Sequence, residues 1–78
     1  ILAEHRAVRT AAGLFDVSHM GEVEITGPRA ADLCARLFTN DARTLETGRT
    51  QYSLIPNEQG GVVDDIIVYR LGDERFLV

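Results

Sequence analysis

The sequence has few of the features that mark several large classes of protein. Its single cysteine, Cys34, excludes an internal disulfide and is compatible with a reducing compartment. It has no apolar run of about 18 residues, so we expect no transmembrane helix, and no signal peptide is visible. It has no basic cluster and a net charge of -4, which argues against nucleic-acid binding.

Residues that could bind a metal or form a nucleophilic triad are also scarce. His5, His19 and Cys34 do not have the spacing of a metal site, so we expect no metal. Asp16, Ser18 and His19 lie too close together in sequence to converge as a triad without special backbone geometry. A lone histidine is more often a structural residue than a ligand.

The composition is that of one small globular unit. The chain has 78 residues, of which 45% are hydrophobic and 26% charged. It starts on Ile1 and stops at Val78 within an apolar strand pattern, whereas natural termini are usually polar and loose. We therefore expect residues 1–78 to be part of a larger domain, truncated at both ends, with a small core of their own.

Apolar periodicity predicts two helices. The first covers residues 2–12 and ends at Gly13, a residue suited to a helix C-terminus. The second opens at Pro28, which suits a first helical turn. Its apolar stripe has helical spacing and comprises Ala30, Leu33, Cys34, Leu37 and Phe38.

Alternating and apolar runs predict the strands. Residues 56–60 have strong turn chemistry, so the runs on either side of them should form a β-hairpin. The predicted class is α+β, with a mostly antiparallel sheet and flanking helices, as an incomplete fragment of a larger domain. The predicted strands are 14–18, 21–26, 49–55, 61–71 and 76–78.

Two adjacent carboxylates, Asp64 and Asp65, interrupt the apolar run of the second hairpin strand. Side chains alternate faces along a strand, so these carboxylates point to opposite faces and cannot form an acid–base pair. With a four-residue loop, Tyr52 would lie opposite Asp65, and Ser53 opposite Asp64. Asp65 would then share its face with Tyr52, Ile67 and Tyr69, which suits a flat heteroaromatic ligand.

A purely structural interpretation remains open for both aspartates. Each carboxylate could accept hydrogen bonds from backbone amides near the end of the hairpin. This interpretation is favoured for Asp64, which lies nearer the turn. For Asp65, residue chemistry alone leaves the structural and functional interpretations evenly balanced.

Three stretches together resemble one family. They are "HRAVR" from His5, "AGLFDVSHMGEVEITGP" from Ala12, and "LFTNDARTLETGRTQYSLIPNEQGGVVDDIIVYR" from Leu37. They are similar to the aminomethyltransferase, or T-protein, of the glycine cleavage system. The resemblance implies transfer of a one-carbon unit from the lipoyl arm of H-protein to tetrahydrofolate, with release of ammonia and formation of 5,10-methylenetetrahydrofolate.

The resemblance also implies roles for individual residues. Asp65, the second aspartate of the pair, would be catalytic and lie against the pterin of tetrahydrofolate. The implied folate-binding residues are Met20, Tyr52, Asp65, Ile67 and Tyr69. The implied partner is lipoylated H-protein, with no metal, nucleic acid or membrane, in the cytoplasm or, in a eukaryote, the mitochondrial matrix. The 78 residues alone would be inactive.

Two alternatives share the implied fold. One is the folate-binding domain of a dimethylglycine or sarcosine dehydrogenase or oxidase, which receives its one-carbon unit from a flavin domain. The other is a non-catalytic folate-binding module, whose members tend to lack the paired aspartates. A flavin-binding domain upstream would distinguish the first alternative from an aminomethyltransferase.

Overall fold

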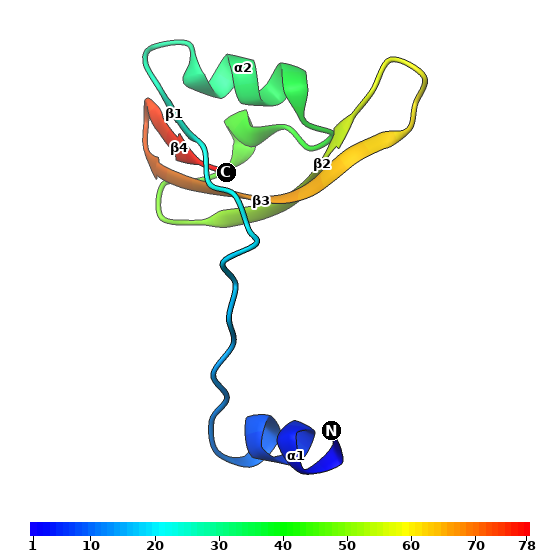
Figure 1. The fold of residues 1–78 in the computed structure, drawn as a ribbon. Helices are drawn as coiled ribbons and strands as arrows, with labels where there is room; N and C mark the ends of the chain where they lie inside the picture. Colours follow the sequence, from blue (N-terminus) through cyan, green and yellow to red (C-terminus); the bar gives the residue numbers. More distant parts are fainter.

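Two helices, a short 3-10 helix and four strands make up the protein in a computed structural model that describes all of residues 1–78. Figure 1 shows a sheet with a helix packed on it, and an N-terminal arm leading away from both. The elements are α1 (Leu2–Thr10), β1 (Glu24–Thr26), α2 (Ala30–Leu37), η1 (Ala42–Thr44), β2 (Thr50–Pro56), β3 (Val62–Gly72) and β4 (Arg75–Leu77).

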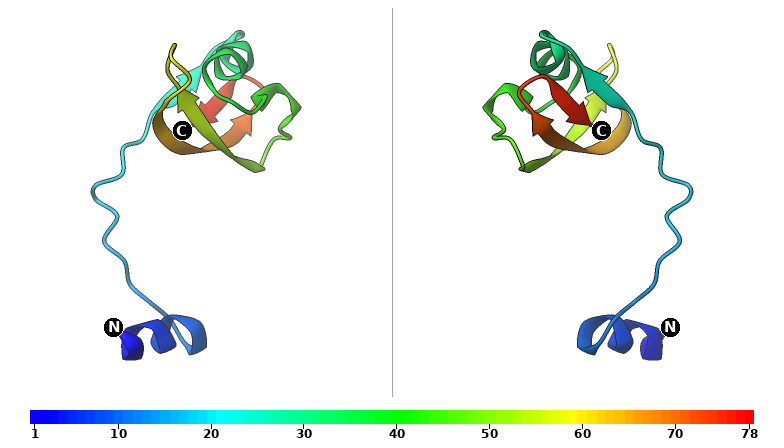
Figure 2. Two further views of the ribbon diagram at one scale, coloured as in Figure 1. Left: turned by 90° about the vertical axis from the view of Figure 1, so that its right-hand side faces the viewer. Right: turned by 90° about the vertical axis from the view of Figure 1, so that its left-hand side faces the viewer.

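The four strands form one antiparallel sheet in the order β1-β4-β3-β2. β3 is central and long, and β2 lies at one edge of the sheet. The α+β class and the antiparallel hairpin predicted from the sequence are therefore confirmed. Figure 2 shows α2 on one side of the curved sheet, so the other side of the sheet has no helix against it.

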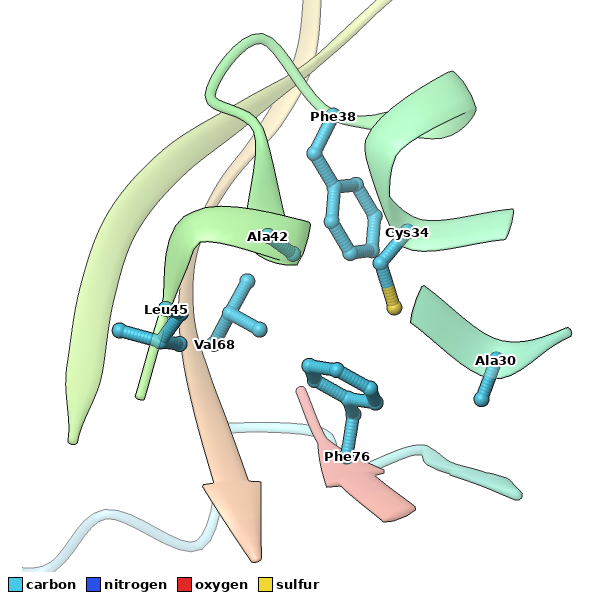
Figure 3. Close-up of a cluster of buried hydrophobic side chains, with 7 residues drawn as sticks. All are labelled: Ala30, Cys34, Phe38, Ala42, Leu45, Val68 and Phe76. Atoms are coloured by element: carbon cyan, nitrogen blue, oxygen red, sulfur yellow. The ribbon is translucent and has the colours of Figure 1, made fainter. Parts of the chain in front are cut away.

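The core lies between α2, η1 and the covered face of the sheet (Figure 3). Phe76 of β4 and Val68 of β3 project from the sheet into this layer and are fully buried. Cys34 meets them from α2 and is fully buried too, as its place on the apolar stripe predicted. Only seven buried apolar residues form this cluster: Ala30, Cys34, Phe38, Ala42, Leu45, Val68 and Phe76.

Helix α2 is shorter than the sequence predicted and buries a narrower stripe. It begins at Ala30, two residues after Pro28, and the chain turns through Gly27 at φ 118° to reach it. Leu33 and Leu37 belong to the predicted stripe but are exposed, because only the ridge of residues four apart meets the sheet.

The N-terminal arm differs most from the prediction. Helix α1 ends at Thr10, because Ala11 leaves helical geometry with φ -140°, and Gly13 does not act as a left-handed cap. Residues 14–18 do not form the predicted strand. A strand needs a partner for its backbone groups, and this segment makes only local bonds, such as Met20 N–H to Val17 C=O at 3.0 Å.

The remaining boundaries are close to the predicted ones. β1 covers only Glu24–Thr26 of the predicted 21–26, although Val23 exchanges two backbone hydrogen bonds of 2.8 Å with Val78. The two hairpin strands begin and end one residue later than predicted. Neither helix is both long and apolar enough to cross a membrane.

Candidate functional site

The uncovered face of the sheet carries most of the predicted site. Asp65, Ile67 and Tyr69 alternate along β3 and project from this face, while Ile66 and Val68 point toward α2. Tyr52 lies across from Ile67 on β2 and shares the uncovered face. We call the side chains of Tyr52, Leu54, Asp65, Ile67, Tyr69 and Leu77 the open face.

A hydrogen bond joins two predicted site residues on the open face. The Tyr52 hydroxyl donates to Asp65 Oδ2 at 3.2 Å. The predicted pairing of these residues is nevertheless wrong, because Tyr52 lies opposite Ile67, and Asp65 opposite Leu54. Tyr52 reaches Asp65 diagonally, over a separation that a long aromatic side chain can span.

The register error has a local cause at the hairpin end. The predicted loop was Asn57 to Gly60, but Pro56 pairs with Val62, and Asn57 N–H donates to Gly61 C=O at 2.8 Å. A further irregularity between Ile55 and Pro56 adds a second one-residue shift. Two shifts of one residue keep the same side chains on each face, while every directly opposed pair changes. Ser53 therefore faces Ile66 and not Asp64.

The open face is accessible along its whole length. The exposed fractions are 59% for Tyr52, 43% for Ile67 and 40% for Tyr69. Leu54 and Leu77 are half-buried beside them. Asp65 is exposed, and its Oδ1 oxygen accepts no hydrogen bond from the protein, so it is free to accept one from a ligand.

The Tyr52 hydroxyl is held in its protonated form. Desolvation by neighbouring atoms raises the pKa of Tyr52, and the hydrogen bond to Asp65 and the charge of that carboxylate act in the same direction. At neutral pH the phenol is therefore a donor, which matches the donor role it has toward Asp65.

Asp64 points to the other side of the sheet, as alternation predicted. It lies opposite Ile55 near the hairpin end and is exposed. Its Oδ1 oxygen accepts a hydrogen bond of 3.0 Å from the amide of Asp65. The backbone hydrogen bond that the structural interpretation predicted for Asp64 is therefore present, and the two carboxylates do not form a pair.

Met20 and His19 stand apart from the open face. Met20 belongs to the extended arm before β1, is 61% exposed, and makes no hydrogen bond to the sheet. His19 sits in the turn between Val17 and Met20 and is also exposed. Thus the structure brings Tyr52, Asp65, Ile67 and Tyr69 together on one face but leaves Met20 outside that group.

The sequence did not predict a polar contact at the edge of β2 that involves Thr39, Asn40 and Ser53. Thr39 and Asn40 follow α2 and hydrogen-bond to the backbone and side chains of β2, where Ser53 is only 1% exposed. No local pattern announces this contact, because it depends on where the end of α2 meets the sheet. The burial of Ser53 follows from its facing α2, on the side opposite to Tyr52.

A separate hollow lies between β1 and α2, away from the open face. It has a volume of about 810 Å³ and is lined in part by Arg29, Arg36 and Arg43. Arg43 is already paired with Asp41 at 2.9 Å. No group of three or more His, Cys, Asp and Glu side chains is arranged to hold a metal ion.

Comparisons with known proteins identify the family. The family described as the GCVT N-terminal domain matches residues 1–78. An aminomethyltransferase of Symbiobacterium thermophilum is 59% identical over 97% of this chain and 20% of its own length. An aminomethyltransferase of Thermus thermophilus is 55% identical over the whole chain and 22% of its own length.

A solved structure agrees with these matches. The crystal structure of glycine cleavage system aminomethyltransferase T from Bartonella henselae has a TM-score of 0.77 and 38% identity, covering 81% of this chain and 18% of that one. The chain thus spans about a fifth of the length of the curated relatives that it matches. It belongs to the GCVT N-terminal domain family, which it shares with these aminomethyltransferases.

Proposed function

We propose that this chain forms one wall of the tetrahydrofolate site in an aminomethyltransferase of the glycine cleavage system. The donor would be the aminomethyl group on the lipoyl arm of H-protein, and the products would be ammonia and 5,10-methylenetetrahydrofolate. Family membership and the names of the relatives support this reaction class. In those relatives about four-fifths of the length lies outside the match, and residues there would supply the other contacts.

One observation supports the proposal for individual residues. Tyr52 hydrogen-bonds one oxygen of Asp65 and leaves the other oxygen free, among the exposed apolar side chains of the open face. A flat heteroaromatic ring with N–H groups matches such a surface, because its faces can stack on tyrosine while an N–H donates to the carboxylate. The pyrimidinone ring of the tetrahydrofolate pterin is flat, and the pterin carries several N–H groups, so it is a ligand of this kind.

Each proposed binding residue has a distinct part. Asp65 would accept a hydrogen bond from the pterin, and Tyr52 would hold the carboxylate in place for it. Ile67 and Tyr69 would contact the rings, since both are exposed next to Asp65 on β3. Met20 belongs to the proposed site by the family resemblance, and as part of the exposed arm it would contact the folate from outside the sheet.

The reaction needs a group that handles protons. Bonds from the transferred carbon to N5 and N10 form while its bonds to the amino nitrogen and the lipoyl sulfur break. The protons from N5 and N10 end on ammonia and on the thiol. As an accessible carboxylate, Asp65 can orient N5, accept its proton and stabilise the cationic iminium that forms as ammonia leaves.

The proposal includes the setting of the reaction. Lipoylated H-protein would be the protein partner and tetrahydrofolate the acceptor co-substrate. The chemistry above requires no metal, nucleic acid or membrane. The reaction would take place in the cytoplasm or, in a eukaryotic cell, in the mitochondrial matrix, and the 78 residues alone would not catalyse it.

Matched substitutions of the two neighbouring aspartates test this function. In the intact aminomethyltransferase with lipoylated H-protein, Asp65→Asn should lower methylenetetrahydrofolate formation at least about 100-fold, the usual contribution of a positioned acid–base group. Asp64→Asn should retain turnover and change mainly the melting temperature, because the hydrogen bond that the Asp64 side chain makes is to a backbone amide. Normal turnover of a well-folded Asp65→Asn protein, or loss of turnover in a well-folded Asp64→Asn protein, would contradict the assignment.

A further inference from the structure

Strand β2 is an edge strand, and its outward backbone edge is covered by Thr39 and Asn40, which follow Phe38 at the C-terminal end of α2. Thr39 N–H donates to the Leu54 carbonyl at 3.0 Å, and Leu54 N–H donates to Thr39 Oγ1 at 3.1 Å. Asn40 Nδ2 donates to the Tyr52 carbonyl at 2.6 Å. These bonds hold the backbone on either side of Ser53, at Leu54 and at Tyr52, which carries the phenol.

Ser53 fastens the same segment from below the sheet. Its Oγ accepts a hydrogen bond of 3.0 Å from Asn40 N–H and lies 3.3 Å from Thr39 Oγ1. Because Ser53 is 1% exposed, these hydrogen bonds have no water to replace them, and breaking one leaves a buried polar atom unpaired. We call Thr39, Asn40 and Ser53 the clasp.

We propose that the clasp is a positioning device that fixes Tyr52 so that its hydroxyl reaches Asp65. Tyr52 lies on an edge strand, which has a neighbouring strand on one side only. Without the clasp, the free side of such a strand would fray. The Tyr52 hydroxyl reaches Asp65 diagonally at 3.2 Å, so a small displacement of the backbone breaks the bond. The Asn40 bond to the Tyr52 carbonyl prevents that displacement.

The clasp holds β2 along its outer edge, through Thr39 and Asn40, and from the covered side of the sheet, through Ser53. Ser53 faces α2, whereas Tyr52 and Asp65 belong to the open face. The clasp bonds only the backbone of Tyr52 and Leu54 and the Ser53 side chain, so its residues are positioning residues and not catalytic ones. The effect on turnover rests on the proposed function, while the effect on the Tyr52 phenol does not.

The first measurement needs no substrate. In the full-length protein labelled with [¹³Cζ]tyrosine, the Tyr52 resonance is assigned by its loss in Tyr52→Phe and titrated with pH by NMR. The pKa of Tyr52 is raised partly by Asp65. Asn40→Ala and Ser53→Ala should each move it back toward the ordinary value, by less than Asp65→Asn does.

The hairpin loop offers a matched control. The side chain of Asn57 also holds a backbone segment. Its Oδ1 oxygen accepts hydrogen bonds from the amides of Gln59 at 3.0 Å and Gly61 at 2.8 Å. Asn57→Ala should lower the melting temperature but leave the pKa of Tyr52 unchanged. A role of the clasp in stability alone would likewise change only the melting temperature.

The second measurement is turnover. Asn40→Ala should lower kcat/KM for tetrahydrofolate about tenfold, within the range seen when a reacting group is displaced by about 1 Å. The clasp proposal fails if both clasp variants leave the pKa of Tyr52 unchanged, or if Asn57→Ala shifts it as much as they do. Normal turnover in Asp65→Asn would instead refute the proposed function, and the titration would still decide the role of the clasp.

Discussion

Replacing Arg70 by lysine should destabilise this protein far more than a conservative change at the surface. Arg70 lies on β3 with its side chain on the covered side of the sheet and no carboxylate partner. Its guanidinium instead donates to three backbone carbonyls, those of Leu45 at 2.7 Å, Gly72 at 3.2 Å and Asp73 at 3.2 Å. It also lies 5.2 Å from the centre of the Phe76 ring.

The magnitude follows from these contacts. A hydrogen bond to a charged group contributes about 1.5–3 kcal/mol, and a partly exposed cation–π contact about 0.5–1 kcal/mol. An ammonium is a point charge that cannot reach three separated carbonyls, so lysine keeps roughly one of these bonds. At the lower end of the hydrogen-bond range, we expect Arg70→Lys to cost about 3 kcal/mol for two lost bonds and Arg70→Ala about 4.5 kcal/mol for three. Proteins have a total stability of only about 5–15 kcal/mol, so either loss is large.

The assay is urea unfolding followed by far-ultraviolet circular dichroism, with Arg75→Lys as the matched control. Arg75 lies on the neighbouring strand β4 and pairs with Glu24, but both side chains are exposed. Such pairs contribute about 0.2–1 kcal/mol, so we expect a change below about 0.5 kcal/mol in the control. The reasoning is refuted if Arg70→Lys costs no more than Arg75→Lys.

A double-mutant cycle isolates the aromatic contact. Phe76→Leu keeps an apolar side chain in the core but removes the ring beneath Arg70. Combined with Arg70→Ala, which removes the cation, it should give a coupling energy of about 0.5–1 kcal/mol. A coupling of zero would assign the whole effect of Arg70 to its bonds with the carbonyls.

Two further predictions concern titratable groups. The pKa of Asp41 is held below its ordinary value of 3.8, first by hydrogen bonds from Arg43, so the bonded carboxylate stabilises the fold above that pH and loses its effect as the pH falls below it. The difference in melting temperature between the natural protein and Asp41→Asn should therefore shrink as the pH falls from about 5 to below 3.8, and a constant difference would contradict this origin. Burial raises the pKa of the Cys34 thiol, so its reaction with Ellman's reagent at about pH 8 should be at least about 100-fold slower than in urea, and equal rates would mean that α2 opens readily.

Local chemistry in the sequence was enough to predict the hairpin and to predict which side chains share each face of β3. The turn residues around Asn57 and Gly60 predicted the hairpin, and Gly60 adopts a φ of 84° that favours glycine. Strand alternation and the predicted register placed Tyr52, Asp65 and Tyr69 on one face, and the structure keeps that grouping. It survived because the register was wrong by two residues, an even number.

Elements without a partner were the ones predicted wrongly. Residues 14–18 have apolar side chains of the right type for a strand, but a strand exists only where another strand accepts its hydrogen bonds. The outer part of the α2 stripe, Leu33 and Leu37, is apolar in sequence but exposed, because a helix packs only the ridge that meets its neighbour. Periodicity indicates which residues could be buried and not which surface buries them.

By itself, the sequence determined that Asp64 and Asp65 act on opposite sides of a strand, because the period of two is a local property of the extended backbone. Only the tertiary structure decided that Tyr52 bonds Asp65 diagonally, that Arg70 binds three carbonyls, and that the segment after α2 covers the edge of β2. The Tyr52–Asp65 bond joins residues 13 positions apart in sequence, the bond from Arg70 to Leu45 joins residues 25 apart, and the bond from Asn40 to Tyr52 joins residues 12 apart. Their geometry depends on how a bulge, a loop and a helix end meet in space, which no local pattern encodes.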